Sequence, residues 1–158
     1  MAYEALQLEL AKETELGILM SWFHDLQSCR DWGGPDFRFP FSKQSFQADL
    51  RWELYRGYVL KGRSNTLLGF GQFYQRNGRC HLARLVVAPD KRGQGLGKVL
   101  VKALMAEGYK QLQLSGCSLF VLKHNAAAKA CYQGLGFQPA EYPEPISELA
   151  GCDYLICN

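Results

Sequence analysis

The sequence predicts an α+β domain built on one mixed β-sheet. Strand-like apolar runs alternate along the chain with stretches whose apolar residues recur at helical spacing. No segment repeats or has low complexity. At 158 residues, of which 47% are hydrophobic, the chain can bury one core of ordinary size. We therefore expect residues 1–158 to form a single domain.

The first third of the chain should hold one strand and two helices. Residues 6–10, LQLEL, alternate as a strand does, and a helix is expected over residues 14–29 with Thr14 as its cap. Residues 30–41, RDWGGPDFRFPF, contain two glycines and two prolines and are expected to form a loop. Ser42 should begin a second helix, which the pattern extends to residue 54.

Strands and helices alternate through the rest of the chain. The turn signals GRSN and RNGR separate three successive strands, and a long helix with Leu96, Leu100 and Leu104 on one apolar stripe follows. The expected strands are residues 57–62, 66–75, 80–89, 117–122, 137–142 and 153–156, and the expected helices are residues 95–111 and 125–136.

The composition argues against several classes of protein. A formal net charge of +3 and a pI near 8.5 are too mild to indicate nucleic-acid binding. No apolar run approaches the roughly 20 residues that cross a bilayer, and MAYEALQLELAKETE carries acids where a signal peptide is basic. We expect a cytoplasmic protein with no membrane or nucleic-acid partner.

The cysteines do not form a recognisable metal or disulfide pattern. They are scattered, without a Cys-x-x-Cys pair or a histidine at metal-ligand spacing. We expect reduced, mostly buried thiols and no metal site. The six are Cys29, Cys80, Cys117, Cys131, Cys152 and Cys157.

The stretch KRGQGLGKVLV, residues 91–101, has the composition of a phosphate-binding loop. A P-loop needs a glycine at position 92 and a hydroxyl at position 99, where this chain has Arg92 and Val99. The dinucleotide fingerprint fails in both registers, because Lys98 or Leu100 occupies its last position. Glycines before a helix still let the N–H groups of its first turn bind an anion, here a pyrophosphate. A plain glycine-rich turn explains these residues equally well.

The motifs around this loop, taken together, resemble the acetyl-coenzyme A (acetyl-CoA) dependent N-acetyltransferases of the GNAT superfamily. LVVAPDKRGQGLGKVL, residues 85–100, is followed by NAAAKACYQGLGF, residues 125–137. This resemblance implies a GNAT-type mixed, mostly antiparallel sheet flanked by helices, and an enzyme that uses acetyl-CoA. The matching positions within residues 82–137 are Val87 and Pro89, Arg92-x-x-Gly95-x-Gly97, Asn125, Tyr132 and Gly136–Phe137.

The resemblance also implies which residues bind the cofactor. In this family the strand before the loop diverges from its neighbour, and its free backbone groups, here those of Leu85, Val86 and Val87, bind pantetheine. Asn125 would hold the pantetheine amides, and Lys129 either reaches a phosphate or is a solvated surface lysine. The residues that match the pyrophosphate loop are Arg92, Gly93, Gln94, Gly95, Leu96, Gly97 and Lys98.

Two catalytic roles follow from the same resemblance. Tyr132 matches the phenol that protonates the departing CoA thiolate, with a packing tyrosine as the alternative. His81 stands eleven residues before Arg92, where a related branch carries a glutamate base, and a packing role fits His81 equally well. About 13 Å of regular strand would separate His81 from Leu85, so a base role needs a water molecule or a bulge. Arg84 should be either structural or acceptor-binding.

The aromatic loop is expected to line the acceptor pocket, because the connection between the first two helices does so in this family. Trp32 is predicted as a wall of that pocket and Asp31 as the partner of a cationic amine, whereas most other rings of the loop should pack on the core. Branches that acetylate protein N-termini often carry an acid where this chain has Phe120. That difference disfavours a peptide N-terminus as the acceptor.

The sequence thus predicts an N-acetyltransferase that moves the acetyl group of acetyl-CoA to a primary amine by direct attack in a ternary complex. Two alternatives stay open. One is a protein lysine or N-terminal acetyltransferase of the ribosomal-protein type, and the other is a non-catalytic module that binds or senses acyl-CoA. The sequence identifies neither the acceptor nor the oligomeric state.

Overall fold

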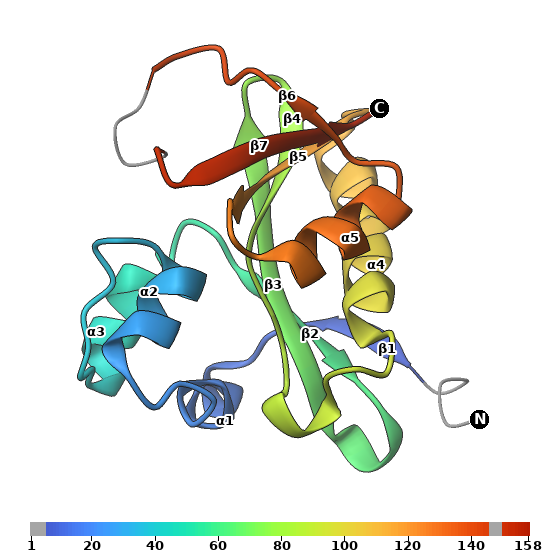
Figure 1. The fold of residues 1–158 in the computed structure, drawn as a ribbon. Coiled ribbons are helices and arrows are strands. Elements are labelled where there is room, and N and C mark those ends of the chain that lie inside the picture. Colours follow the sequence, from blue (N-terminus) through green and yellow to red (C-terminus); the bar gives the residue numbers. More distant parts are fainter. Residues whose placement is uncertain (1–5, 146–149) are drawn as a thin grey trace.

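Seven strands form one sheet in the order β1-β2-β3-β4-β5-β7-β6 (Figure 1). The structure, a computed structural model, describes residues 6–145 and 150–158. Among these residues all neighbouring strands are antiparallel except β4 and β5, which are parallel. The predicted α+β fold with a mixed, mostly antiparallel sheet is confirmed. The strands are β1 (Gln7–Leu10), β2 (Gly57–Lys61), β3 (Leu67–Arg76), β4 (Arg79–Val87), β5 (Cys117–Leu122), β6 (Gln138–Ala140) and β7 (Cys152–Cys157).

Helices cover both faces of this sheet. Figure 1 shows α1, α2 and α3 on one side and α4 and α5 on the other. Leu104 of α4 and Leu82 share one buried core, and Phe46 of α3 and Phe70 share the other. Within the described residues, no helix is long and apolar enough to span a membrane. The helices are α1 (Leu16–Met20), α2 (Leu26–Gly33), α3 (Lys43–Asp49), α4 (Leu96–Leu112) and α5 (Ala126–Gly134).

The single helix predicted over residues 14–29 is wrong. The chain forms a 3₁₀ turn at Glu13–Glu15, then α1, and then α2 after a break. The break is stabilised by Asp25, whose side chain accepts a hydrogen bond from the N–H of Ser28 at 2.7 Å and so starts a new helix. α2 extends into the predicted loop and ends before Gly34, where a φ of 112° suits glycine.

The second helix begins as predicted and ends early. Ser42 caps α3 by accepting a hydrogen bond from the N–H of Ser45 at 3.0 Å, and the Ser45 hydroxyl accepts one from the N–H of Ser42 at 3.0 Å. α3 stops at Asp49 instead of residue 54, and Arg51 adopts a left-handed φ of 54°. From Gly57 onward, the strands and helices lie within a few residues of their predicted positions.

A β-bulge in β4 places the residues that follow it. Arg84 and Leu85 together lie opposite the single residue Gly71 of β3, and Arg84 has a φ of 52°. A β-carbon at Gly71 would come within 2.5 Å of Leu104 and 2.8 Å of Leu85, so only glycine leaves room for both leucines. A bulge bends its strand. β4 pairs with β5 only on the side of the bulge nearer the start of the strand.

Candidate active site

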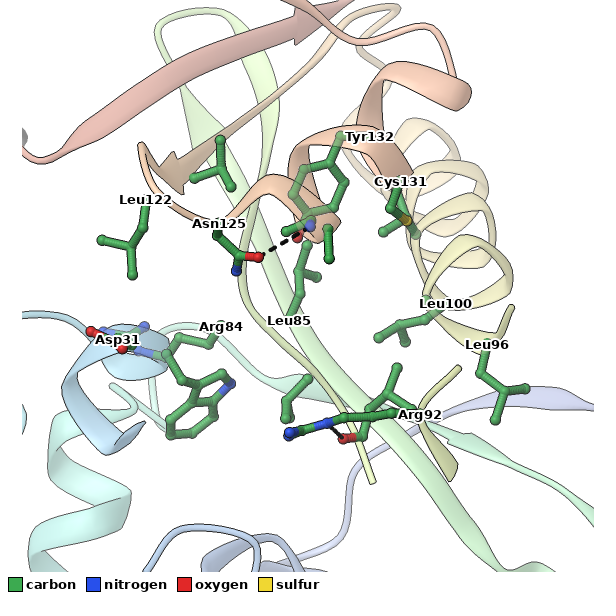
Figure 2. Close-up of a pocket in the computed structure, with 18 of the residues that line it drawn as sticks. Asp31, Arg84, Leu85, Arg92, Leu96, Leu100, Leu122, Asn125, Cys131 and Tyr132 are labelled. Carbon is green, nitrogen blue, oxygen red and sulfur yellow. Dashed lines mark hydrogen bonds between the residues drawn. The ribbon is translucent and has the colours of Figure 1, made fainter. Parts of the chain in front are cut away.

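Strands β4 and β5 diverge after three paired residues. Parallel pairing joins Cys80–Leu82 to Cys117–Leu119, whereas β4 continues to Val87 and β5 to Leu122. A cavity of about 840 Å³ opens there, and we call it the strand cleft (Figure 2). Among the described residues no strand pairs with this edge of β4 beyond Leu82. The backbone groups of that edge can therefore pair with an extended ligand.

The glycine-rich loop lies beside the strand cleft and leaves its backbone open. Gly93 and Gly95 have φ values of 79° and 80°, and a β-carbon on either would meet no atom within 4 Å. α4 begins directly after Gly95, so the free N–H groups of its first turn adjoin the same space. The Nε of Arg92 donates to the carbonyl of Val87 at 3.3 Å, which leaves the rest of the guanidinium for an anion.

Helix α5 supplies another wall of the strand cleft. The Oδ1 of Asn125 accepts a hydrogen bond from the N–H of Ala128 at 3.1 Å and caps α5, so its amide group is left as a donor (Figure 2). Tyr132 lies about two turns further along, with its ring centroid 6.1 Å from that of Phe137. Burial raises the pKa of Tyr132, so the phenol keeps its proton at neutral pH.

A second cavity, of about 920 Å³, shares a wall with the strand cleft. Asp31 and Trp32, predicted to bind the acceptor, both lie in that shared wall. Asp31 is exposed and accepts a hydrogen bond from Gln27 Nε2 at 2.6 Å. Trp32 stacks on Phe23 with ring centroids 4.3 Å apart, and its buried Nε1 has no hydrogen-bond partner among the described residues.

The other rings of the predicted aromatic loop pack on the protein core, as expected. Phe37 is 2% exposed, and Phe39 and Phe41 pack against the same cluster. Trp32 therefore differs from its aromatic neighbours, because it is the ring of this segment that lines both cavities.

His81 lies outside the strand cleft, in a wall of the second cavity. It is 2% exposed, its Nδ1 lies 2.9 Å from the hydroxyl of Ser118, and the rings of Tyr74 and Phe120 pack on it. Burial, with a smaller contribution from Arg76, lowers the pKa of His81 to about 3. Such an imidazole is neutral at pH 7 and accepts a proton poorly. These observations favour packing over the predicted role as base.

Two residues predicted for the cofactor loop and its surroundings do not line the strand cleft. The Nζ of Lys129 forms an ion pair with Asp153 at 2.6 Å, and Asp153 also binds Lys123 at 2.7 Å. Lys129 is therefore engaged by a carboxylate that it shares with Lys123. Gln94 lies in the loop between the two open glycines, outside the lining. Arg92 and Lys98 do line the cleft.

Sequence reasoning missed part of the second cavity. Arg51 and Tyr55 line it from the segment that follows α3, and Tyr74 lines it from β3. Arg51 was predicted to lie within a helix that extends to residue 54, and no local sequence pattern indicates that Tyr55 or Tyr74 lines a cavity. Within residues 6–145 and 150–158, no group of three His, Cys, Asp or Glu side chains could hold a metal ion.

The chain belongs to the GNAT family of acetyltransferases. The family model, described as "Acetyltransferase (GNAT) family", matches residues 26–137. This range contains β4, the glycine-rich loop, α4, β5 and α5, which together form the strand cleft. The resemblance that the motifs indicated is confirmed, and the protein is an N-acetyltransferase of this family.

Relatives and solved structures extend the comparison. A Bacillus subtilis (strain 168) protein assigned as a ribosomal protein bS18-alanine N-acetyltransferase is 24% identical over 127 residues, which are 80% of this chain and 83% of that protein. AAC(6')-Ib in complex with ribostamycin and coenzyme A has a TM-score of 0.76 at 20% identity, over 98% of this chain and 93% of that chain. The Vibrio cholerae spermidine N-acetyltransferase in complex with CoA and spermine has a TM-score of 0.73 at 17% identity, over 96% and 92%. At these identities the solved structures establish the fold.

Proposed function

We propose that the protein transfers the acetyl group of acetyl-CoA to a primary amine by direct attack in a ternary complex. The observation that carries this proposal is the wall shared by the strand cleft and the second cavity. A cosubstrate in the first and an acceptor in the second meet beside Arg84, so no covalent enzyme intermediate is needed. Two solved neighbours hold coenzyme A, which supports this choice of cosubstrate.

The strand cleft offers donors that suit the parts of acetyl-CoA. The backbone of Gly93, Gly95 and the first turn of α4 binds the pyrophosphate, with Arg92 and Lys98 adding positive charge. The free edge of β4 pairs with the amides of the pantetheine chain, as an added strand would. The amide group of Asn125 donates to a pantetheine carbonyl.

The chemistry needs one donor for the oxyanion and one acid for the thiolate. The amine nitrogen attacks the thioester carbon, and the charge on the carbonyl oxygen is stabilised by the backbone N–H near Leu85. The nitrogen gives its proton to solvent, the C–S bond breaks, and the CoA thiolate takes the proton of Tyr132. Because burial raises its pKa, Tyr132 is protonated when the C–S bond breaks, and its hydroxyl donates to the sulfur as negative charge develops there. Tyr132 then recovers a proton from solvent.

The acceptor must lose a proton before it attacks, because an amine with a pKa near ~10 is mostly cationic at pH 7. His81 is a weak base, with its pKa at about 3. We assign this first deprotonation to water in the second cavity, which is open to solvent beside the exposed carboxylate of Asp31.

A protein N-terminus is the second candidate acceptor, because the Bacillus subtilis relative is named for an alanine of a ribosomal protein. Phe120 argues against it. Its ring lies in the shared wall and packs on His81 and Tyr154, with centroids 4.8 and 5.5 Å away. The wall is therefore apolar at a position where the resemblance associates a carboxylate with peptide acceptors.

The cofactor assignment is tested with Gly95→Asp against Gly78→Asp. Both glycines have a positive φ, 80° and 74°, and open surroundings, so the backbone strain is matched. Only Gly95 lines the strand cleft. By calorimetry, we expect the Kd for acetyl-CoA to rise about 100-fold in the first variant and less than about threefold in the second. Unchanged affinity in folded Gly95→Asp would contradict the pyrophosphate site.

Transfer itself is tested by the release of the CoA thiol. Wild-type protein is mixed with acetyl-CoA and a panel of polyamines, amino acids, aminoglycosides and peptides, and at least one amine should give turnover. Tight acetyl-CoA binding with no turnover on any amine would support the acyl-CoA binding module instead.

A further inference from the structure

The second cavity carries more positive than negative charge in its walls. One of its aspartates, Asp49, is already engaged: Arg38 Nη2 donates to its Oδ1 at 2.9 Å and the backbone N–H of Arg38 to its Oδ2 at 2.9 Å. The charged residues of the described walls are Arg30, Arg51, Arg76, Arg84, Asp31, Asp36 and Asp49.

Two of the four arginines have partners that hold them against the protein. Arg30 donates from Nε to the carbonyl of Phe37 at 3.1 Å. Arg76 donates to the hydroxyl of Tyr142 at 2.7 Å and lies over the ring of Phe120, 5.1 Å from its centroid. Of the four, Arg84 is the arginine that lines both cavities, and Arg51 is the one whose charge acts on Arg84.

Arg84 is fixed in orientation and has no acidic partner in the described part of the chain. It lines both cavities, and Figure 2 shows it extending from β4 toward α2. Its Nε donates to the carbonyl of Gly33 at 3.2 Å and its Nη1 to Gln72 Oε1 at 3.0 Å. Gln72 is itself held by the carbonyls of Leu50 and Tyr55, at 2.9 and 2.7 Å. The Nη2 of Arg84 is left to donate to a ligand.

Arg51 is an exposed second cation close enough to repel Arg84. Burial lowers the pKa of Arg84 most, and the repulsion of Arg51 lowers it further, whereas Tyr74 and Asp49 act in the opposite direction. Asp49, the carboxylate whose attraction reaches Arg84, is already engaged by Arg38. An anion bound between them would relieve the repulsion and accept two charge-assisted hydrogen bonds.

We propose that the acceptor is a small molecule with a carboxylate as well as its amine, as in an amino acid, and that Arg84 and Arg51 bind the carboxylate. This rests on the proposed transfer to an amine. Arg84 directly precedes Leu85, whose N–H is assigned to the acetyl carbonyl, and Arg84 lines both cavities. Asp31, in the shared wall, is placed to attract the ammonium group.

This acceptor class differs from the ligands in the neighbouring structures. One of those structures holds spermine, a polyamine that carries several positive charges and no carboxylate. In this chain Arg84 and Arg51 repel such a molecule from the second cavity. The cavity volume of about 920 Å³ falls in the range of small-molecule sites.

The first experiment compares acceptors that differ only at the carboxylate. Each L-amino acid is paired with its carboxamide, spermidine is added as the polycation, and CoA release gives kcat/KM. The pH-independent values are compared, because amidation lowers the pKa of the amine. For at least one amino acid, we expect kcat/KM to be about 30-fold or more above that of its carboxamide, and at least as far above that of spermidine.

The second experiment tests whether Arg84 and Arg51 cause the preference for a carboxylate. Arg84→Gln should raise KM for the preferred amino acid about 100-fold, and Arg51→Gln about 10-fold. Each substitution should lower kcat/KM for the amino acid at least about tenfold more than kcat/KM for its carboxamide, and the Kd for acetyl-CoA should stay within about threefold of wild type. Arg63→Gln is the matched control, because Arg63 is exposed and lines neither cavity. If Arg84→Gln does not fold, Arg51→Gln decides the assignment alone.

The outcomes separate this inference from the proposed function. Equal turnover of amino acids and carboxamides, or a preference for spermidine or peptides, overturns the carboxylate site and leaves acetyl transfer standing. A carboxylate preference that survives both arginine substitutions overturns the assignment to Arg84 and Arg51. Failure of every amine to release CoA removes the proposed function, and this inference with it.

Discussion

Acid should destabilise the protein through His81. The pKa of this side chain is about 3 in the folded protein and 6.5 in the absence of burial. Between these values the unfolded chain binds a proton that the folded chain excludes, so this stabilisation is complete above pH 6.5 and is lost as the pH falls toward 3. The two values differ by about 3.5 pH units, equivalent to about 5 kcal/mol, of which about 2 kcal/mol is lost between pH 7 and pH 5.

The substitution His81→Asn removes the titrating ring and keeps an amide that can still bond the hydroxyl of Ser118. The variant should be less stable than wild type at pH 7, because a smaller side chain leaves a cavity. Its free energy of unfolding should nevertheless fall by about 2 kcal/mol less than that of wild type between pH 7 and pH 5. Urea melts at the two pH values measure this difference.

His24→Asn is the control, since His24 is exposed, and it should keep the acid sensitivity of wild type. Equal acid sensitivity of His81→Asn and wild type would refute the buried, neutral state of His81. The His81→Asn variant also tests the role of His81 in catalysis. A packing role leaves acetyl transfer within about tenfold in the folded variant, whereas loss of a true base would lower it by about 100-fold or more.

Two further predictions concern the strand cleft. Tyr132→Phe keeps the ring packing and removes the acid, so single-turnover acetyl transfer should fall about 100-fold with the Kd for acetyl-CoA unchanged. Wild-type rates in that variant would make Tyr132 a packing residue only. Acetyl-CoA should also raise the Tm equally with and without a chelator, because the proposed phosphate site uses backbone N–H groups and cations. A Tm increase that disappears with chelator would refute the metal-free site.

The parts of the fold that the sequence predicted are those governed by regular periodicity. The strands from Gly57 onward and helix α4 have long apolar patterns bounded by turn residues, and α4 ends where Gln113 takes a left-handed φ of 56°. The region before β2 was predicted less well. There, the capping side chain of Asp25 breaks a helix that apolar spacing alone would continue.

The strand cleft could be predicted from the sequence, whereas most of the second cavity could not. The residues of the glycine-rich loop and α5 lie in contiguous motifs, so Gly95, Asn125 and Tyr132 could be assigned from sequence and are found in the strand cleft. The second cavity is assembled from segments far apart in the chain. Arg51 comes from the turn after α3 and Arg84 from a bulge in β4, and no periodic pattern indicates that both line one cavity.

The bulge in β4 lies between the strand cleft and the second cavity, and it contains an arginine, Arg84, at a position that would suit glycine. A left-handed backbone costs a non-glycine residue about 1–2 kcal/mol, and a glycine at position 84 would avoid that cost. The hydrogen bonds of Arg84 to Gly33 and Gln72 offset it by tying α2 to the sheet, and they engage Nε and Nη1. Both acceptors are neutral oxygens, so a neutral side chain with two donor groups would suffice for such a tie. The charge and the remaining Nη2 donors of the guanidinium go beyond it, and they face the cavity in which a carboxylate would bind.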